Sequence, residues 1–169
     1  MHFEDTPVCG QFCSPCVAHY GEGLNVGYRY YDRHGGAAFP FGHGLSYSCF
    51  EYADMKVEAQ GERLSVRCGV KNVSERDGKE IVQLYVRPFD PFVYRPEKEL
   101  KGSQKIAVKA GGEWEAVFVL QKDAFAYWST AVDGWRVDDG LYEILIGASS
   151  QDIRLKALVE WKGGAVHMV

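Results

Sequence analysis

Three cysteines near the start of the chain have the spacing that most suggests a reactive site. Cys9, Cys13 and Cys16 lie close together, and thiolates at such spacing bind soft metals. A zinc site would need a fourth ligand, for which only His19 is near. An iron–sulfur cluster of the kind that serves S-adenosylmethionine chemistry would need a barrel of helices and strands, which the sequence does not predict. We therefore predict no metal and no cofactor, and the role of the three cysteines stays open.

Paired carboxylates are the second group that could do chemistry. Glu75 with Asp77, and Asp138 with Asp139, provide acidic pairs, but both fall in predicted turns beside glycine. Turn formation and solvation account for such residues, whereas general acid–base catalysis needs carboxylates that converge in a pocket. We predict no catalytic residue in this chain.

Bulk composition excludes several classes of function. The chain has 169 residues, a net charge of −4 and 46% hydrophobic residues, which is typical of a globular protein with one domain and a tail. No basic stripe indicates a nucleic-acid partner, and no apolar run approaches the ~20 residues that span a membrane. The first residues lack a signal-peptide pattern, yet an upstream signal would be missing from a partial sequence, so localisation stays open among cytoplasm, periplasm and secretion.

From about residue 50 the sequence predicts strands. Leu64, Val66, Cys68 and Val70 alternate with polar or small residues, the period of a strand with one buried face. The same alternation recurs along the chain, with reversals at Gly61-Glu62, 76–78, Gly111-Gly112 and 138–140. The expected strands are 52–59, 64–70, 82–86, 100–108, 114–120, 142–146 and 153–161.

About seven short alternating strands predict an all-β fold, an antiparallel β-sandwich of the immunoglobulin-like or fibronectin type III-like kind. Trp114 and Trp161 are expected in its core. Tyr142, after Gly140, is placed where such sandwiches carry a corner tyrosine, although a plain core aromatic fits equally. The charges of 97–101 suit an exposed sheet edge. Asn72-Val73-Ser74 would be a glycosylation acceptor in a secreted eukaryotic protein.

Residues 1–44 differ in composition and pattern from the predicted strands. They are rich in glycine, aromatics and cysteine, and they show little alternation. An aromatic linker of this kind would expose much apolar surface if it were free. We therefore expect it to pack against a neighbour that the chain does not contain.

Several strings then resemble a known family. Residues 20–32 (YGEGLNVGYRYYD) and 39–47 (FPFGHGLSY) resemble the passage from the second domain into the C-terminal domain of family 3 glycoside hydrolases, the β-glucosidases and their relatives. The likeness continues through 78–86 (GKEIVQLYV), 95–102 (RPEKELKG) and 147–155 (GASSQDIRL), in the family's order. The cysteine cluster stands where the family has a different stretch, which leaves the contacts of that part of the linker open.

The resemblance implies a division of the chain and a role. Residues 1–44 would be a linker and the end of an upstream catalytic α/β domain, 45–162 a fibronectin type III-like domain, and 163–169 a tail. The family's catalytic Asp and Glu lie upstream of everything matched here, so the chain alone is not expected to be an enzyme. Its expected role is to stabilise and orient the catalytic domains of a β-glucosidase-like hydrolase of carbohydrate metabolism.

The expected partners are therefore the catalytic domains of the parent enzyme, through intramolecular contacts, with carbohydrate bound only through that enzyme. The candidate interdomain contacts are Tyr28, Arg29, Tyr30, Tyr31, Phe39 and Phe41. The alternative is a free-standing carbohydrate-binding or protein-interaction sandwich. It would use the aromatics in or beside predicted loops, which are Tyr94, Tyr127, Trp128 and Trp135.

Overall fold

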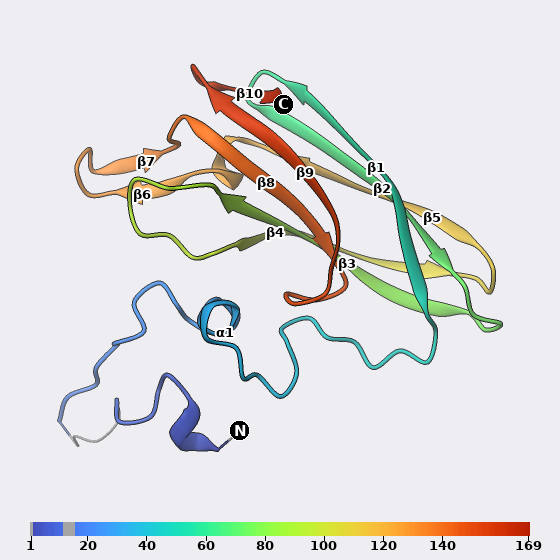
Figure 1. Ribbon diagram of the computed structural model, residues 1–169, viewed down its shortest axis with the longest axis horizontal. Coiled ribbons are helices and arrows are strands. Elements are labelled where there is room, and N and C mark those ends of the chain that lie inside the picture. Colours follow the sequence, from blue (N-terminus) through green and yellow to red (C-terminus); the bar gives the residue numbers. More distant parts are fainter. Residues whose placement is uncertain (1, 12–15) are drawn as a thin grey trace.

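The computed structural model describes residues 2–11 and 16–169 and shows a chain built almost entirely of strands (Figure 1). One helix, α1 (Tyr28–His34), and two single 3-10 turns, η1 (Phe3–Asp5) and η2 (Lys122–Ala124), complete these ranges. The strands are β1 (Phe50–Gln60), β2 (Arg63–Asn72), β3 (Gly78–Pro88), β4 (Glu99–Val108), β5 (Glu113–Leu120), β6 (Tyr127–Ser129), β7 (Gly134–Arg136), β8 (Gly140–Gly147), β9 (Ile153–Lys162) and β10 (Ala165–Met168).

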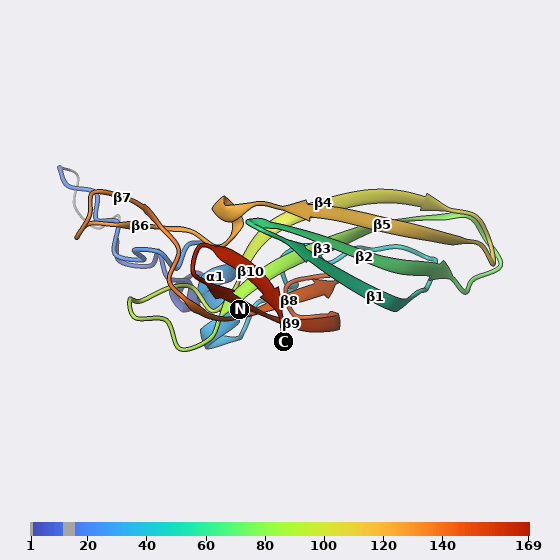
Figure 2. The same cartoon turned by 90° about the horizontal axis from the view of Figure 1, so that it is seen from above.

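Two antiparallel sheets pack face to face, which confirms the predicted sandwich. One sheet has the order β1-β2-β5 and the other β10-β9-β8-β3-β4, while β6 and β7 form a separate hairpin. Seen from above, this hairpin projects from one end of the sandwich and the β4–β5 turn lies at the other end (Figure 2). The linker crosses beneath the sandwich, away from the C-terminus (Figure 1).

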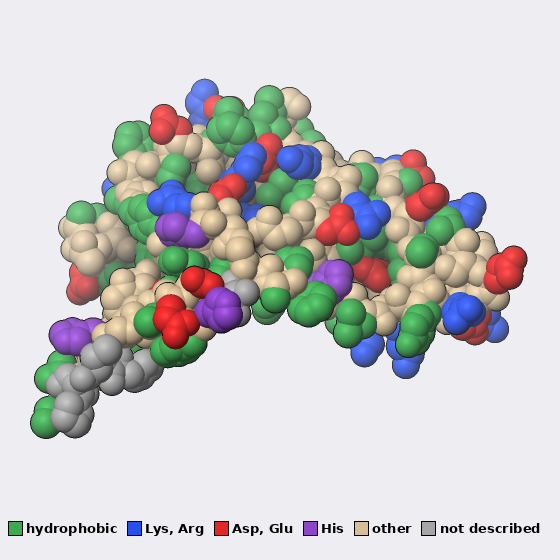
Figure 3. Space-filling model, turned by 60° about the horizontal axis from the view of Figure 1, so that its bottom comes forward, with side chains coloured by type: hydrophobic (Ala, Val, Ile, Leu, Met, Phe, Trp, Pro, Cys, Tyr) green, Lys and Arg blue, Asp and Glu red, His purple; other side chains and the backbone are tan. Residues whose placement is uncertain are grey.

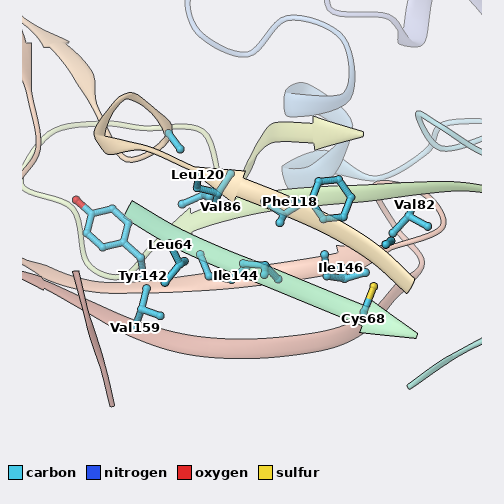
Figure 4. Packing of buried hydrophobic residues seen from close by; sticks show 14 of the residues in the cluster. Leu64, Cys68, Val82, Val86, Phe118, Leu120, Tyr142, Ile144, Ile146 and Val159 are labelled. Atoms are coloured by element: carbon cyan, nitrogen blue, oxygen red, sulfur yellow. The ribbon is translucent and has the colours of Figure 1, made fainter. Parts of the chain in front are cut away.

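The core lies between the two sheets and follows the predicted alternation. Leu64, Val66, Cys68 and Val70 of β2 are all buried, and each alternates with a more exposed neighbour. They meet apolar side chains from the opposite sheet, including Val82, Ile144, Ile146 and Val159 (Figure 4). Burial of each large aliphatic side chain contributes about 1.5–3 kcal/mol of transfer free energy, so these facing rows hold the two sheets together.

Of the two tryptophans expected in the core, only Trp161 is buried there. Trp161 of β9 is buried against Phe125, with ring centroids 5.3 Å apart. Trp114 is 48% exposed, so its prediction was wrong. It lies second in β5, directly after the β4–β5 turn at the outer end of the sandwich (Figure 2).

One helix and three strands were not predicted from the sequence. The helix α1 lies in the segment expected to be an extended linker, and the hairpin β6–β7 lies in a predicted loop. Residues 163–169, expected as a tail, contain β10, which pairs with β9. Gly163 and Gly164 both have positive φ and provide the tight reversal that allows this pairing.

The two sheets are also tied along both of their open sides. On one side the Val166 amide of β10 donates to the Gly61 carbonyl in the β1–β2 turn, at 2.8 Å. On the other side the Val117 amide of β5 donates to the Gln104 side chain of β4, at 3.2 Å. These bonds satisfy edge groups that would otherwise face solvent.

Asn72, part of the possible glycosylation sequence, is fully buried. Its side-chain amide donates to the carbonyls of Arg76 at 2.8 Å and Val108 at 3.0 Å. The side chain therefore fixes the β2–β3 turn and is not accessible to a modifying enzyme in the folded protein. No helix among the described residues has the length and apolarity to cross a membrane.

Tyr142 is a corner tyrosine: its hydroxyl donates to the Asp138 carbonyl at 2.9 Å. We predict that Tyr142→Phe lowers the free energy of unfolding by about 1 kcal/mol, the usual net contribution of one such bond. Tyr47→Phe is the control, since Tyr47 is 89% exposed, and it should leave stability unchanged. Urea denaturation followed by tryptophan fluorescence measures both variants, and equal stability of Tyr142→Phe and the unaltered chain would contradict the bond's role.

Candidate functional site

The helix α1 is too short to be stable by itself. It has seven residues between Gly27 and Gly35, which both have positive φ and mark its two ends. Isolated helices below about 12–15 residues are marginal in water. Tertiary contacts must therefore hold α1 in place, and those contacts define the first part of the candidate site.

A buried ion pair fastens α1 to the sandwich. The Lys98 ammonium lies 2.7 Å from Asp32 Oδ1, and the two side chains are only 9% and 1% exposed. Gln151 donates to the same oxygen at 2.8 Å, whereas Asp32 Oδ2 has no donor among the described residues. Burial raises the pKa of Asp32, although Lys98 opposes that shift. Separating the two side chains would leave a buried charge without a partner, which is strongly unfavourable. The pair therefore fixes the position of the helix.

A second, larger charge cluster surrounds Glu99. Its carboxylate accepts from Arg29 and Arg95, each at 3.0 Å, and Lys101 lies 3.6 Å away. Burial alone would raise the pKa of Glu99, but Lys101 and the two guanidinium groups outweigh burial and hold it below its usual range. Glu99 is therefore ionised and joins α1, through Arg29, to strand β4.

Backbone and ring contacts complete the attachment of the linker. The Leu100 amide donates to the Tyr28 hydroxyl at 2.8 Å, and the Tyr28 ring stacks on Phe41 with centroids 4.9 Å apart. Gln83 donates to the Gly42 carbonyl at 3.1 Å. Gly42 has positive φ, and a Cβ there would overlap the Gln83 side chain, so only glycine fits.

The structure places the six predicted contact residues in three pairs. Tyr28 and Arg29 contact the chain's own sandwich. Tyr30 packs edge-on against Tyr31 and stacks on His34. The remaining two, Phe39 and Phe41, are exposed in the linker. A role for the six in contacts with an upstream domain stays a prediction.

Other exposed apolar side chains accompany Phe39 along the linker. This set, here called the linker strip, consists of Tyr20, Val26 and Phe39 of the linker together with Leu45 and Tyr47, which lie between the linker and the start of β1. Figure 3 brings the linker side forward and shows hydrophobic side chains along it. Beside Leu45 and Tyr47 the surface is hollowed, with a cavity of about 870 Å³ between residues 42–48 and strands β3 and β4. We predict that this exposed apolar surface takes part in interdomain contacts.

A second hollow, here called the end groove, lies where the β6–β7 hairpin, the β3–β4 loop and the linker meet. Its volume is about 1260 Å³. All four loop aromatics singled out in the sequence line it: Tyr94, Tyr127, Trp128 and Trp135. The two tryptophans are cross-strand partners with ring centroids 5.7 Å apart and planes at 88°.

The remaining candidates for chemistry have structural surroundings. Asp77 accepts from the Ala110 amide at 2.9 Å, and Asp138 accepts from Arg136 at 2.6 Å, so both carboxylates support turns. Cys9 and Cys16 are exposed, while Cys13 lies outside the described residues. Within residues 2–11 and 16–169, His, Cys, Asp and Glu side chains form no group of three that could hold a metal ion.

Sequence reasoning missed the buried charges. Lys98 and Glu99 belong to a segment read as a solvated edge, and that reading was wrong because both pack against α1. Arg29 is 70 positions from Glu99, and Asp32 is 119 from Gln151. No local spacing could reveal partners so distant. The only available signal was the concentration of charge in 97–101, where the edge strand β4 begins.

The chain is similar in sequence to known proteins. A family model described as "Fibronectin type III-like domain" matches residues 80–150. The chain is 51% identical over 145 residues to thermostable β-glucosidase B of Acetivibrio thermocellus, covering 83% of this chain. It is 44% identical over 146 residues to an exo-α-(1→6)-L-arabinopyranosidase of Bifidobacterium breve, covering 85%.

A solved structure agrees with these matches. The crystal structure of a GH3 β-glucosidase from Bifidobacterium adolescentis superposes with a TM-score of 0.87 at 41% identity, and the match covers 93% of this chain and 24% of that one. The chain spans 19% of the length of each of the two curated relatives named above.

The Glu99 cluster generates a stability prediction. Because the pKa of Glu99 is lowered in the folded chain, its stabilisation is complete above the ordinary value of 4.5 and is lost as pH falls through the lowered pKa. We predict that Glu99→Gln costs on the order of 2 kcal/mol at pH 7. The deficit relative to the unaltered chain should shrink as the pH falls from 4.5 through the lowered pKa of Glu99.

Denaturation curves at pH 7 and at acid pH measure this difference. Glu97→Gln is the matched control, because Glu97 lies 3.8 Å from Arg87 and is more exposed, and it should cost much less. A deficit for Glu99→Gln that is the same at both pH values would show that its charge does not stabilise the fold.

Proposed function

Because this chain is a C-terminal piece of a family 3 glycoside hydrolase and carries the fibronectin type III-like domain of that family, we propose that it holds the enzyme's catalytic domains in place. The domain itself is non-catalytic. Its contribution to the parent enzyme is mechanical: it stabilises and orients the polypeptide that precedes it.

One observation carries the proposal: the linker is fixed on one side and uncovered on the other. Its inner side is fastened to the sandwich by the Asp32–Lys98 pair and the Glu99 cluster. Its outer side presents the linker strip and the hollow next to Leu45 and Tyr47. A rigid apolar surface needs a partner, and the catalytic domains of the parent supply one.

The reaction belongs to the parent enzyme. Two relatives are named for β-glucosidase and arabinopyranosidase activity, and retaining glycoside hydrolysis needs two carboxyl groups about 5–5.5 Å apart. The acidic pairs of this chain support turns instead. The choice of sugar is therefore made in the parent's upstream domains, and different relatives act on different glycosides.

The linker strip provides a direct test in the full-length parent enzyme. We predict that Leu45→Ser and Tyr47→Ser each lower its unfolding temperature by roughly 3 °C, because apolar contacts with the catalytic part are lost. The same changes in the isolated chain should have no effect, since both side chains are exposed there. Activity at a temperature well below unfolding should stay within about twofold. The lost contacts do not touch the substrate, so they do not change how the enzyme stabilises the transition state of the reaction.

The control is Val169→Ser, an exposed apolar residue at the C-terminus, which lies on the opposite side of the molecule from the linker (Figure 1). It should leave both proteins unchanged. Equal destabilisation of the full-length enzyme and the isolated chain by the strip variants, or of neither, would reject the linker strip as an interdomain surface.

A second prediction concerns the chain alone. Incubated with p-nitrophenyl β-D-glucoside, it should release no p-nitrophenol above the buffer blank, because its carboxylates do not converge in a pocket. Release of p-nitrophenol that persists through repeated purification would contradict the non-catalytic role.

A further inference from the structure

The end groove is positively charged, although the chain as a whole carries −4. Five cationic side chains line it against three carboxylates, which leaves two positive charges in excess. The cations are Arg29, Arg63, Arg95, Lys101 and Lys122, and the carboxylates are Glu62, Glu99 and Asp123. An anionic ligand is the electrostatic complement of such a surface.

The excess charge comes from Arg29, Arg95 and Lys101, which are here called the floor of the groove. Arg29, Arg95 and Lys101 share one carboxylate, Glu99. Burial lowers the pKa of Lys101, and repulsion by Arg95 and Arg29 acts in the same direction, although Glu99 opposes it. One carboxylate does not neutralise three cations. A second carboxylate at this floor would relieve their repulsion.

An aromatic wall stands beside this floor. The Arg95 guanidinium lies 5.4 Å from the centroid of the Tyr127 ring, and Trp128 and Trp135 line the same groove. Trp128 and its partner Trp135 are 51% and 72% exposed, so both indole rings offer surface to a ligand. Rigid rings with a polar edge suit ligands that are apolar on one face and polar at the rim.

Hydrogen-bonding side chains complete the lining. The uncharged ones are Gln60, Gln121, Ser129 and Thr130. A sugar ring has an apolar C–H face, which packs on an aromatic ring, and a rim of hydroxyl groups, which bonds to amides and hydroxyls. The carboxylates of an acidic peptide would pair with the cations, but they have no apolar ring face to pack on the two exposed indole rings.

We propose that the end groove binds an acidic oligosaccharide, one built from uronic acid units. A sugar ring packs on Trp128 or Trp135, and a carboxylate of the same chain of sugars pairs with Lys101 and Arg29. This site is separate from the linker strip, and its existence does not depend on the mechanical role proposed above.

Titration calorimetry of the chain with three probes tests the proposal: trigalacturonate, cellotriose and hexaglutamate. Trigalacturonate should give saturable heat. Cellotriose lacks the carboxylates and hexaglutamate lacks the sugar rings, so each should bind at least about tenfold more weakly, a loss of about 1.4 kcal/mol. Added salt should weaken trigalacturonate binding, because the ion pairs are partly exposed.

Variants locate the binding. Trp135→Ala and Lys101→Met should each weaken trigalacturonate at least about fivefold, or roughly 1 kcal/mol. Trp114→Ala is the matched control, a half-exposed tryptophan outside the groove, and it should bind as the unaltered chain does. Thermal unfolding confirms that each variant is folded before titration. Trp135 is largely exposed, so its removal keeps the test independent of any folding defect in Lys101→Met.

Three results would overturn the proposal. The absence of saturable heat with trigalacturonate would remove the site. Equal binding of hexaglutamate would identify an acidic polypeptide as the occupant. An equal loss of binding in Trp114→Ala and Trp135→Ala would show that the groove is not where the sugar binds.

Discussion

A carboxylate and an ammonium group buried together determine how the two parts of this chain are arranged. Asp32 belongs to the linker and Lys98 to the sandwich, and neither charge could stay in its nearly dry position without the other. The pair therefore does more than add stability, since it allows only one placement of α1. The neighbouring cluster on Glu99 repeats the constraint with Arg29, so the helix is held at two points along its length.

A linker held in this way is a rigid connection. Side chains that would otherwise be mobile on an extended segment are presented in a fixed arrangement beside the sandwich. In the mechanical role proposed above, the apolar residues on the outer side are preorganised for the catalytic domains, and little conformational entropy remains to be lost when the two parts pack together. The buried charges that attach α1 to the sandwich thus also hold the exposed apolar side chains of the linker strip in place.

The fold could be predicted from the sequence because its strands are amphipathic. A period of two in β2 and β9 identifies the buried face of each strand, and glycine-rich reversals separate them, so local pattern and final structure agree. Trp114 was misassigned because alternation gives the face of a strand but not how far the core extends along it. Lys98, Glu99 and Asp32 were missed because their burial depends on partners far away in the sequence. The end groove could be anticipated only as four separate aromatics, since they converge only when the β6–β7 hairpin packs beside the β3–β4 loop.

The bonds that tie the two sheets along their open sides have a consequence for how the molecule behaves in a crowded solution. Val166 bonded to Gly61, and Val117 bonded to Gln104, occupy backbone groups that would otherwise template a strand from another molecule. Self-association into extended β-structure is thereby discouraged from the moment the sandwich closes. The closed sandwich is therefore a poorer template for strand addition than either sheet would be alone.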